Sequence, residues 1–324
     1  MVDRSNTMSG LSYAVIGTGA LGGFYGARLQ QAGAEVHYLL HRDYEHVRQF
    51  GLVIESPEGN FTLPQVHAYC DAATMPRCDV VIVALKTTQN HLLPGLLPPV
   101  LKDSGVVLVL QNGLGVEAEV ATIVGAERVL GGLCFLCSNK VGPGHIRHLD
   151  YKKITMGEYD ADNQPKGVSD RLKTIAADFE RAGIPIELTD DLVLARWQKL
   201  VWNIPFNGLS VILNATTDAM MAHDAARQLA KELMEEVALG AAAFGRTIPP
   251  SFIQTMLDHT AAMKPYRTSM KIDFEEKRPL EVEAMYGNPL RAAYSVGTTL
   301  PRIQTLYYQL KFLESQYLHN VNSR

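Results

Sequence analysis

Three polar residues in the second half of the chain combine types and spacing that suit chemistry on a small polar molecule. Lys199, Asn203 and Asn207 recur every four residues, so a helix would align them on one face among tryptophan, leucine and isoleucine neighbours. Buried polar side chains need hydrogen-bond partners, and a bound polar substrate is one such partner. An internal hydrogen-bonded network, or the solvent-facing stripe of a surface helix, would also explain the pattern. Pro205 lies within this segment, removes one helical hydrogen bond and favours a kink.

A glycine-rich turn near the N-terminus is the second feature with chemical meaning. Gly17, Gly19 and Gly22 follow the G-x-G-x-x-G pattern between an apolar run and a helix-like segment, as in dinucleotide-binding sites. Gly17 permits the tight turn, Gly19 lets the backbone approach a pyrophosphate, and Gly22 lets the helix pack closely on the strand. The helix N-terminus then offers unpaired N–H groups and a positive dipole end to the phosphates. Unless the motif is a glycine turn of an unrelated α/β domain, the cofactor-binding residues of this loop are Gly17, Thr18, Gly19, Ala20, Leu21 and Gly22.

The end of the second predicted strand indicates which dinucleotide the turn would bind. In NAD-specific sites an acidic residue about 20 residues past the glycines binds the ribose 2′-hydroxyl. Here the strand ends in His41 and Arg42, and no carboxylate precedes Arg42. A guanidinium suits a 2′-phosphate by its charge and fork geometry, so the sequence favours NADP(H) over NAD(H). The alternative is that Arg42 is a solvated loop charge that the neighbouring Asp43 neutralises.

Polar side chains also follow the third and fourth predicted strands. Lys86 follows one of them, and Asn112, within Gln111-Asn112-Gly113, follows the other. Ligands of open α/β sheets bind outside the carboxyl ends of the strands, so we expect Lys86 to contact the cofactor and Asn112 to contact both cofactor and substrate. A surface lysine and an ordinary Asn-Gly turn are the alternatives.

Cys134 and Cys137 have C-x-x-C spacing, but no second pair of cysteines or histidines completes a zinc site, and we expect no metal. A redox pair of the thioredoxin type would open a helix, whereas this pair follows two glycines in a strand-like context. We therefore expect both thiols to be buried or near the cofactor, and we count Cys137 among the cofactor-binding residues.

The elements that must position these residues follow an alternating pattern. Short apolar runs predict strands at 13–16, 35–40, 80–84, 106–110, 154–157 and 184–188. Helical stretches separate them, which is typical of βαβ units and a largely parallel sheet. Residues 52–63 predict a hairpin insert with a turn at 57–60. After residue 190 the pattern is helical, and the prolines at 249–250, 265, 279 and 301 are each expected to lie near a helix start.

Length and composition agree with two folded domains in a reducing compartment. The chain has 324 residues, a net charge of −4 and 47% hydrophobic content. We expect a flexible leader over 1–10, a Rossmann-type α/β dinucleotide-binding domain over 11–189 and an all-helical substrate domain over 190–324. The charge gives no reason to expect nucleic acid, and no apolar run approaches the roughly 20 residues of a membrane span. Four cysteines without a secretory signal favour the cytoplasm.

Taken in order, these motifs resemble those of ketopantoate reductases. The glycine turn, the Leu85-Lys86 strand end, the Asn112 turn and the Lys-x-x-x-Asn-x-x-x-Asn helix occur as in that family, from residue 13 to about residue 317. Ser269 and Glu281, which locally indicate only a capped helix start, fit the same series. The resemblance implies a Rossmann domain followed by a helical domain like the C-terminal domain of 6-phosphogluconate dehydrogenase. A homodimer is compatible with the sequence, which does not determine the oligomeric state.

The resemblance further implies NADPH-dependent reduction of the 2-oxo acid ketopantoate to pantoate. Lys199 matches the family's general acid and Glu281 the acidic residue near the reaction centre, while Asn112, Asn203, Asn207 and Ser269 match substrate-binding positions. Three alternatives stay open: a reductase of another 2-oxo acid or an imine, a dehydrogenase of a phosphorylated or β-hydroxy acid, and a non-catalytic NADP(H)-sensing protein. Thr217 stands where the family carries a further asparagine, which bears on the substrate more than on the reaction type.

Overall fold

A mixed sheet forms the centre of the first of two structural units in the computed structural model, which describes residues 8–321. Its strands are β1 (Ser12–Ile16), β2 (Glu35–Leu39), β3 (Leu52–Glu55), β4 (Phe61–Leu63), β5 (His67–Tyr69), β6 (Cys78–Val83), β7 (Leu101–Val109), β8 (Val129–Gly142), β9 (His145–Glu158) and β10 (Ile186–Thr189). The parallel strands follow the order β5-β2-β1-β6-β7-β8, which is the Rossmann order 3-2-1-4-5-6.

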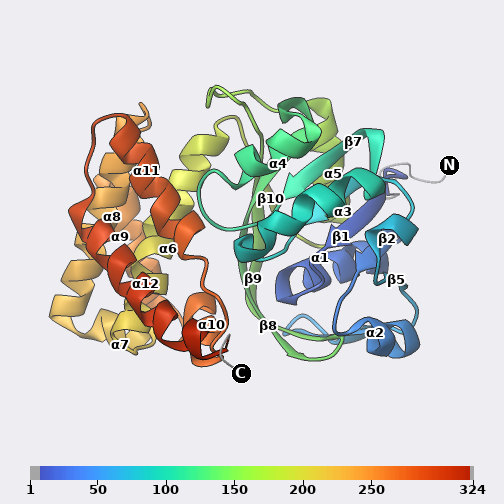
Figure 1. Ribbon diagram of the computed structural model, residues 1–324, viewed down its shortest axis with the longest axis horizontal. Coiled ribbons are helices and arrows are strands. Elements are labelled where there is room, and N and C mark those ends of the chain that lie inside the picture. The colour runs from blue at the N-terminus through green and yellow to red at the C-terminus, as the bar shows by residue number, and fades with distance from the viewer. Residues whose placement is uncertain (1–7, 322–324) are drawn as a thin grey trace. The chain divides into compact units, whose positions relative to one another are not determined.

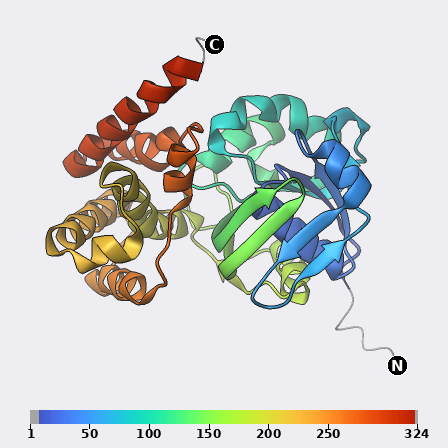
Figure 2. The ribbon, with the colours of Figure 1, turned by 90° about the horizontal axis from the view of Figure 1, so that it is seen from below.

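The long β8–β9 hairpin extends this parallel core. β9 runs antiparallel to β8, and β3 and β10 each pair with β9 in parallel. β4 closes the far edge by pairing antiparallel with β3, so the predicted hairpin insert is confirmed and joins the sheet through β9 (Figure 2). The short β5 was not predicted, because three residues carry too little periodicity to stand out from a loop.

Helices of the first unit connect the parallel strands (Figure 1). They are α1 (Ala20–Gln31), α2 (Tyr44–Phe50), α3 (Leu93–Val100), α4 (Val116–Val124) and α5 (Asp170–Arg181), with the 3-10 turns η2 (Ala72–Thr74), η3 (Thr87–Leu92) and η4 (Ala126–Arg128). α1 packs very closely on the sheet, because a Cβ added at Gly26 would lie 2.7 Å from the ring of Tyr38 and 3.0 Å from Val15. β1 is buried along its whole length and residues 80–83 of β6 are buried on both faces, as a central parallel strand requires.

The N-terminal end of the first unit is anchored on a buried carboxylate. Asp178 of α5 is fully buried and accepts hydrogen bonds from the Tyr13 hydroxyl at 2.7 Å and from the Ser9 amide at 2.8 Å. Arg181 provides its counter-charge at 3.0 Å. The predicted leader over 1–10 lies outside the described residues as far as residue 7, and Ser9 is held by this contact.

The second unit is helical throughout its described residues. Its elements are α6 (Leu192–Ile212), α7 (Thr217–Ala222), α8 (Asp224–Ala243), α9 (Pro250–Ala262), α10 (Ser269–Glu275), the π-helical turn η5 (Glu283–Gly287), α11 (Asn288–Ser295) and α12 (Pro301–Val321). Pro250 and Pro301 open helices, and Pro265 and Pro279 lie in loops a few residues before α10 and η5, so these prolines are near helix starts as predicted. No described helix is long and apolar enough to cross a membrane.

α6 contributes several fully buried side chains to the core of the second unit. Trp197 is fully buried, and a Cβ added at Gly240 of α8 would lie 2.7 Å from its ring. The predicted kink does not interrupt the helix, which runs through Pro205. Ile204 and Phe206 are fully buried on either side of the proline, and the Tyr286 hydroxyl donates to the Ile204 carbonyl at 2.9 Å, so packing stabilises the segment where one helical bond is missing.

The division into units differs in two places from the expected boundary at 189–190. The first unit includes 116–192, so the change to the helical unit falls between Leu192 and Val193. The turn 112–115 belongs to the second unit, although the strand before it belongs to the first. Asn112 is therefore grouped with the helices, which no local pattern indicated.

Candidate functional site

The glycine turn has the geometry that a dinucleotide-binding loop needs at its first and last glycines. Gly17 has a φ of +99°, and a Cβ there would lie 2.5 Å from the backbone nitrogen of Leu85 and 2.7 Å from the carbonyl carbon of Ala84. A Cβ at Gly22 would lie 2.4 Å from the Gly17 carbonyl oxygen and 2.9 Å from the Ala84 Cβ. Only glycine fits at either position, because the backbone after β6 and the first turn of α1 both pack against this loop.

Gly19 differs from its two neighbours in the motif, because a Cβ at this position would meet nothing within 4 Å. It is also the N-cap of α1, and no side chain caps the first turn of that helix. Uncapped N–H groups and open space beside the backbone are what a phosphate needs at a helix N-terminus. The residues present therefore fit a dinucleotide pyrophosphate.

The ends of β1 and β6 meet where the strand order reverses. β1 pairs with β2 on one side and with β6 on the other, so Gly17 and Lys86 follow the two strands that flank the switch point. Lys86 is exposed and precedes η3. The Gln111 amide links this end to β7, since it donates to the Leu85 carbonyl at 2.9 Å. Ligands of doubly wound sheets bind at this point of the topology.

Thr18 and β8 hold the turn from its other sides. The Thr18 hydroxyl donates to the Leu39 carbonyl at 2.9 Å, which fixes the turn to the end of β2. The Ser138 hydroxyl donates to the Ala20 carbonyl at 3.2 Å and so brings β8 to the start of α1. Cys137 precedes Ser138 and is buried, so the segment predicted to contact the cofactor does lie beside the turn. Sequence reasoning missed Ser138, and only its place next to Cys137 could have indicated it.

The other cysteine of the pair faces the first unit's core. Cys134 is buried and contacts the Tyr25 hydroxyl of α1. Burial, with the Cys134 thiol as a smaller contribution, raises the pKa of Tyr25 well above its usual value. All four cysteines are free thiols, and no group of three or more histidine, cysteine or acidic residues suited to a metal occurs in the described part of the chain.

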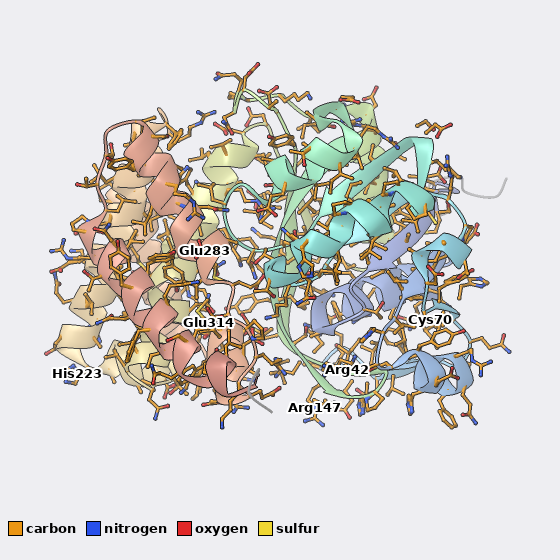
Figure 3. All side chains as sticks on the ribbon, viewed as in Figure 1. Arg42, Cys70, Arg147, His223, Glu283 and Glu314 are labelled. Carbon is orange, nitrogen blue, oxygen red and sulfur yellow. The ribbon has the colours of Figure 1, made fainter. Side chains whose placement is uncertain are left out.

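Arg42 is exposed on the loop between β2 and α2, where Figure 3 labels it. The neighbouring Asp43 does not pair with it. Asp43 is buried, and its Oδ2 accepts the Gly144 amide at 2.9 Å and the Lys140 ammonium from the β8–β9 hairpin. The hypothesis that Asp43 neutralises Arg42 is therefore wrong, because Lys140 already occupies that carboxylate.

In the second unit, the Asn112 turn packs against η5 and α6. Asn203 Nδ2 donates to Asn112 Oδ1 at 3.4 Å, which joins two of the predicted substrate-binding residues directly. A Cβ at Gly113, where φ is +102°, would lie 2.5 Å from the Ala284 carbonyl oxygen. Asn288 of α11 donates to the Leu114 carbonyl at 2.7 Å. The Asn-Gly turn is thus built to fit these helices and is not an ordinary exposed turn.

Asn207 connects α6 to the start of α10. It is buried, and its Oδ1 accepts the Met270 amide at 3.4 Å. Ser210 extends this link, since its hydroxyl donates to the Asn207 carbonyl at 2.9 Å and lies 2.8 Å from that of Thr268, the N-cap of α10. Ser269, the first residue of α10, is half-buried beside this network. The internal network considered from sequence is therefore present at Asn207.

Lys199 and Glu281 are the two charged members of the predicted set. Lys199 is half-buried on α6, one helical turn before Asn203. Glu281 is 6% exposed and lies between α10 and η5. A half-buried lysine one turn from an amide side chain can bind a polar, anionic molecule and deliver a proton to it. Their roles remain a prediction.

Comparison with known proteins gives consistent matches across the chain. The family described as "Ketopantoate reductase PanE/ApbA" matches residues 13–161, and its C-terminal counterpart matches residues 191–314. A relative from Nostoc sp. named 2-dehydropantoate 2-reductase is 63% identical over 309 residues, which cover 95% of this chain and 97% of the relative.

Solved structures agree with these matches. The 2-dehydropantoate 2-reductase of Geobacter metallireducens superposes with a TM-score of 0.89 at 42% identity, covering 94% of this chain and 99% of its own. The enzyme of the same name from Methylococcus capsulatus has a TM-score of 0.86 at 34% identity and covers 95% of this chain and 98% of its own.

Proposed function

The chain belongs to the ketopantoate reductase PanE/ApbA family of oxidoreductases, and from that premise we propose that it reduces ketopantoate to pantoate with NADPH. The observation that carries the proposal is its 63% identity, over 95% of the chain, to a relative named 2-dehydropantoate 2-reductase. The open backbone at Gly19 and the uncapped start of α1 support the dinucleotide part of the reaction.

The first unit binds the cofactor in this proposal. Bound NADPH supplies the hydride that the reaction requires. The glycine loop and the N-terminus of α1 hold the pyrophosphate, and Arg42 binds the 2′-phosphate. The exposed guanidinium of Arg42, which pairs with no carboxylate among residues 8–321, supports NADP(H) over NAD(H). Lys86, Asn112 and Cys137 complete the set of residues that contact the cofactor.

The second unit binds the oxo acid and supplies the proton. Asn112, Asn203, Asn207 and Ser269 hold the substrate in the orientation that exposes its ketone carbon. Negative charge develops on the ketone oxygen during reduction, and the Lys199 ammonium stabilises that charge and then donates its proton to the oxygen. Glu281 favours the charged form of Lys199, which must be protonated at the start of each cycle.

A substrate panel tests this function. Initial rates of NADPH consumption are measured with ketopantoate and with three other 2-oxo acids that differ in side-chain branching, and each is repeated with NADH. We expect the highest kcat/KM for ketopantoate with NADPH. A higher value for another acid would assign the chain a different substrate, and tight NADPH binding without turnover of any acid would indicate a sensing protein.

Two further statements belong to this proposal. We expect a homodimer; a solved structure from Staphylococcus aureus, which is 22% identical to this chain, is described as a "dimeric Ketopantoate Reductase". We also expect a reducing, cytoplasmic setting, in keeping with the four free thiols.

A further inference from the structure

The loop after β2 and the tip of the β8–β9 hairpin meet at one corner of the first unit, which we call the Arg42 corner: Arg42, Asp43, Lys140 and Gly144. The hairpin tip is fastened there by its backbone. The Gly144 carbonyl accepts the Val53 amide at 2.9 Å, and its N–H donates to Asp43 at 2.9 Å. A Cβ at Gly144 would lie 2.9 Å from the Gly51 carbonyl oxygen, so the hairpin tip packs closely against the backbone that precedes β3.

Asp43 is held at this corner by two donors on a single oxygen. Its Oδ2 accepts both the Gly144 amide and the Lys140 ammonium, and the residue is only 8% exposed. A carboxylate so buried would carry an uncompensated negative charge without a cation beside it. Lys140 of strand β8 supplies that cation to Asp43, which is the residue after Arg42 in the chain.

Two other cations of this edge are paired. Arg147 of β9, which Figure 3 labels on the same edge as Arg42, binds Glu55 at 2.5 Å, and Arg48 of α2 binds Glu45 at 3.0 Å. Arg42 differs from them, because it forms no ion pair or side-chain hydrogen bond with any residue in the described part of the chain. Its charge is therefore available to bind an anion from solution.

We propose that Lys140 determines cofactor specificity as a positioning residue: by neutralising Asp43, it keeps the charge of Arg42 available to the 2′-phosphate of NADPH. The inference rests on the proposed use of NADPH. Without Lys140, the Asp43 carboxylate would turn toward the neighbouring Arg42 and pair with it, or its negative charge would repel a phosphate bound to Arg42. Either outcome weakens binding of a 2′-phosphate and leaves a ligand with a free 2′-hydroxyl nearly unaffected.

Calorimetric titration of the full-length protein with 2′,5′-ADP and with 5′-AMP tests the inference, because only the first ligand carries the 2′-phosphate. We expect Lys140→Met to weaken 2′,5′-ADP binding on the order of tenfold, as for an unscreened charge near a surface phosphate, and to change 5′-AMP binding by less than about twofold. Lys140→Arg keeps the cation and should restore the affinity. Lys153→Met makes the same charge change at a lysine paired with Glu187 and should have little effect.

The double variant Asp43→Asn/Lys140→Met separates positioning from direct contact. The asparagine introduced at position 43 can still accept the Gly144 amide but carries no charge, so affinity for 2′,5′-ADP should return to within about threefold of wild type. Affinity that stays as low as in Lys140→Met would overturn the inference, because Lys140 would then act on the phosphate itself or on the loop's fold. Unchanged binding in Lys140→Met would overturn it as well.

The same titrations distinguish this inference from the proposed function. If the wild-type protein binds 2′,5′-ADP no more tightly than 5′-AMP, the preference for NADPH fails and the inference fails with it. If the wild type discriminates between the two ligands and Lys140→Met discriminates equally well, only the role of Lys140 is wrong. Thermal unfolding of each variant shows whether the fold is kept, and Lys140→Met is expected to unfold at a lower temperature than the double variant, because it alone leaves the buried Asp43 carboxylate without a cation.

Discussion

The glycine turn of the first unit and the polar face of α6 in the second are made from different parts of the chain. The turn is built from backbone: missing side chains at Gly17 and Gly22 let β6 and α1 approach, and Gly19 leaves open space. The face of α6 is built from side chains whose partners come from the Asn112 turn and α10. A site formed by the backbone of one turn is determined by the residues of that turn. A site formed by side chains also depends on helices and turns that are distant in the sequence.

The largest expected effect breaks the turn itself. Gly17→Ala should destabilise the first unit by about 2 kcal/mol or more, because the new Cβ meets the backbone of Ala84 and Leu85 and the residue keeps a φ of +99°. Gly33→Ala is the matched control, since Gly33 has the same φ of +99° and nothing within 4 Å of its Cβ position. Chemical denaturation measures both. Equal losses would mean that strain alone, and not close packing, requires glycine at position 17.

Gly19→Val separates binding from folding within the same turn. A side chain at Gly19 enters open space, so stability should be nearly unchanged while affinity for NADP⁺ falls at least about tenfold, because the valine fills the space that the pyrophosphate of the dinucleotide needs. Gly95→Val on α3 places the same side chain in open space away from the turn. Retained nucleotide affinity in Gly19→Val would remove the turn from the cofactor site.

Arg42→Ala tests whether a side chain, in addition to the backbone of the glycine turn, contributes to cofactor binding in the first unit. We expect the KM for NADPH to rise by about tenfold or more and that for NADH to change by less than about threefold, since one charge-assisted contact to a 2′-phosphate is lost. Arg48→Ala, which removes a guanidinium already paired with Glu45, is the control. A similar change for both cofactors would place Arg42 outside the 2′-phosphate site.

The smallest expected effect is a pH dependence within the first unit. Burial lowers the pKa of His37 on β2, although Glu35 opposes the shift and His67 adds to it. Between pH 7 and 5 the unfolded chain therefore binds more protons at this residue than the folded chain, so its contribution to stability is present at neutral pH and is lost as the pH falls. Urea unfolding of His37→Gln at pH 7 and pH 5 should show a weaker loss of stability than wild type. An equal loss would place the dependence elsewhere.

The first unit could be predicted well from local patterns. The alternation of apolar runs and helices indicated the parallel strands β1, β2, β6 and β7, and the glycine spacing indicated the turn, because each signal lies within a few neighbouring residues. The β8–β9 hairpin was harder: only the end of β9, residues 154–157, was predicted, because the length of the hairpin and its contact with Asp43 depend on pairing across the chain. The alternative that Asp43 neutralises Arg42 fails for the same reason, because the partner of Asp43 is Lys140 of the hairpin.

In the second unit, local sequence patterns predicted the helix face but not the contacts that its side chains make. The repeat of Lys199, Asn203 and Asn207 indicated a shared helix face, and α6 provides it. Nothing local indicated that the Asn112 turn belongs to this unit, or that the Asn207 amide would join the start of α10. Pro205 suggested a kink, yet buried neighbours on both sides keep the helix continuous. Tertiary packing decided each of these points.

The most direct test of the account asks whether the two regions have separate tasks. Lys199→Ala should lower kcat for ketopantoate with NADPH by at least ~10²-fold, as expected for a lost general acid, and leave the affinity for 2′,5′-ADP within about twofold of wild type. Lys231→Ala, at a half-buried lysine of α8 that pairs with Glu235, should change neither quantity. Retained kcat in Lys199→Ala with only a raised KM for ketopantoate would contradict the assignment of the chemistry to the second unit.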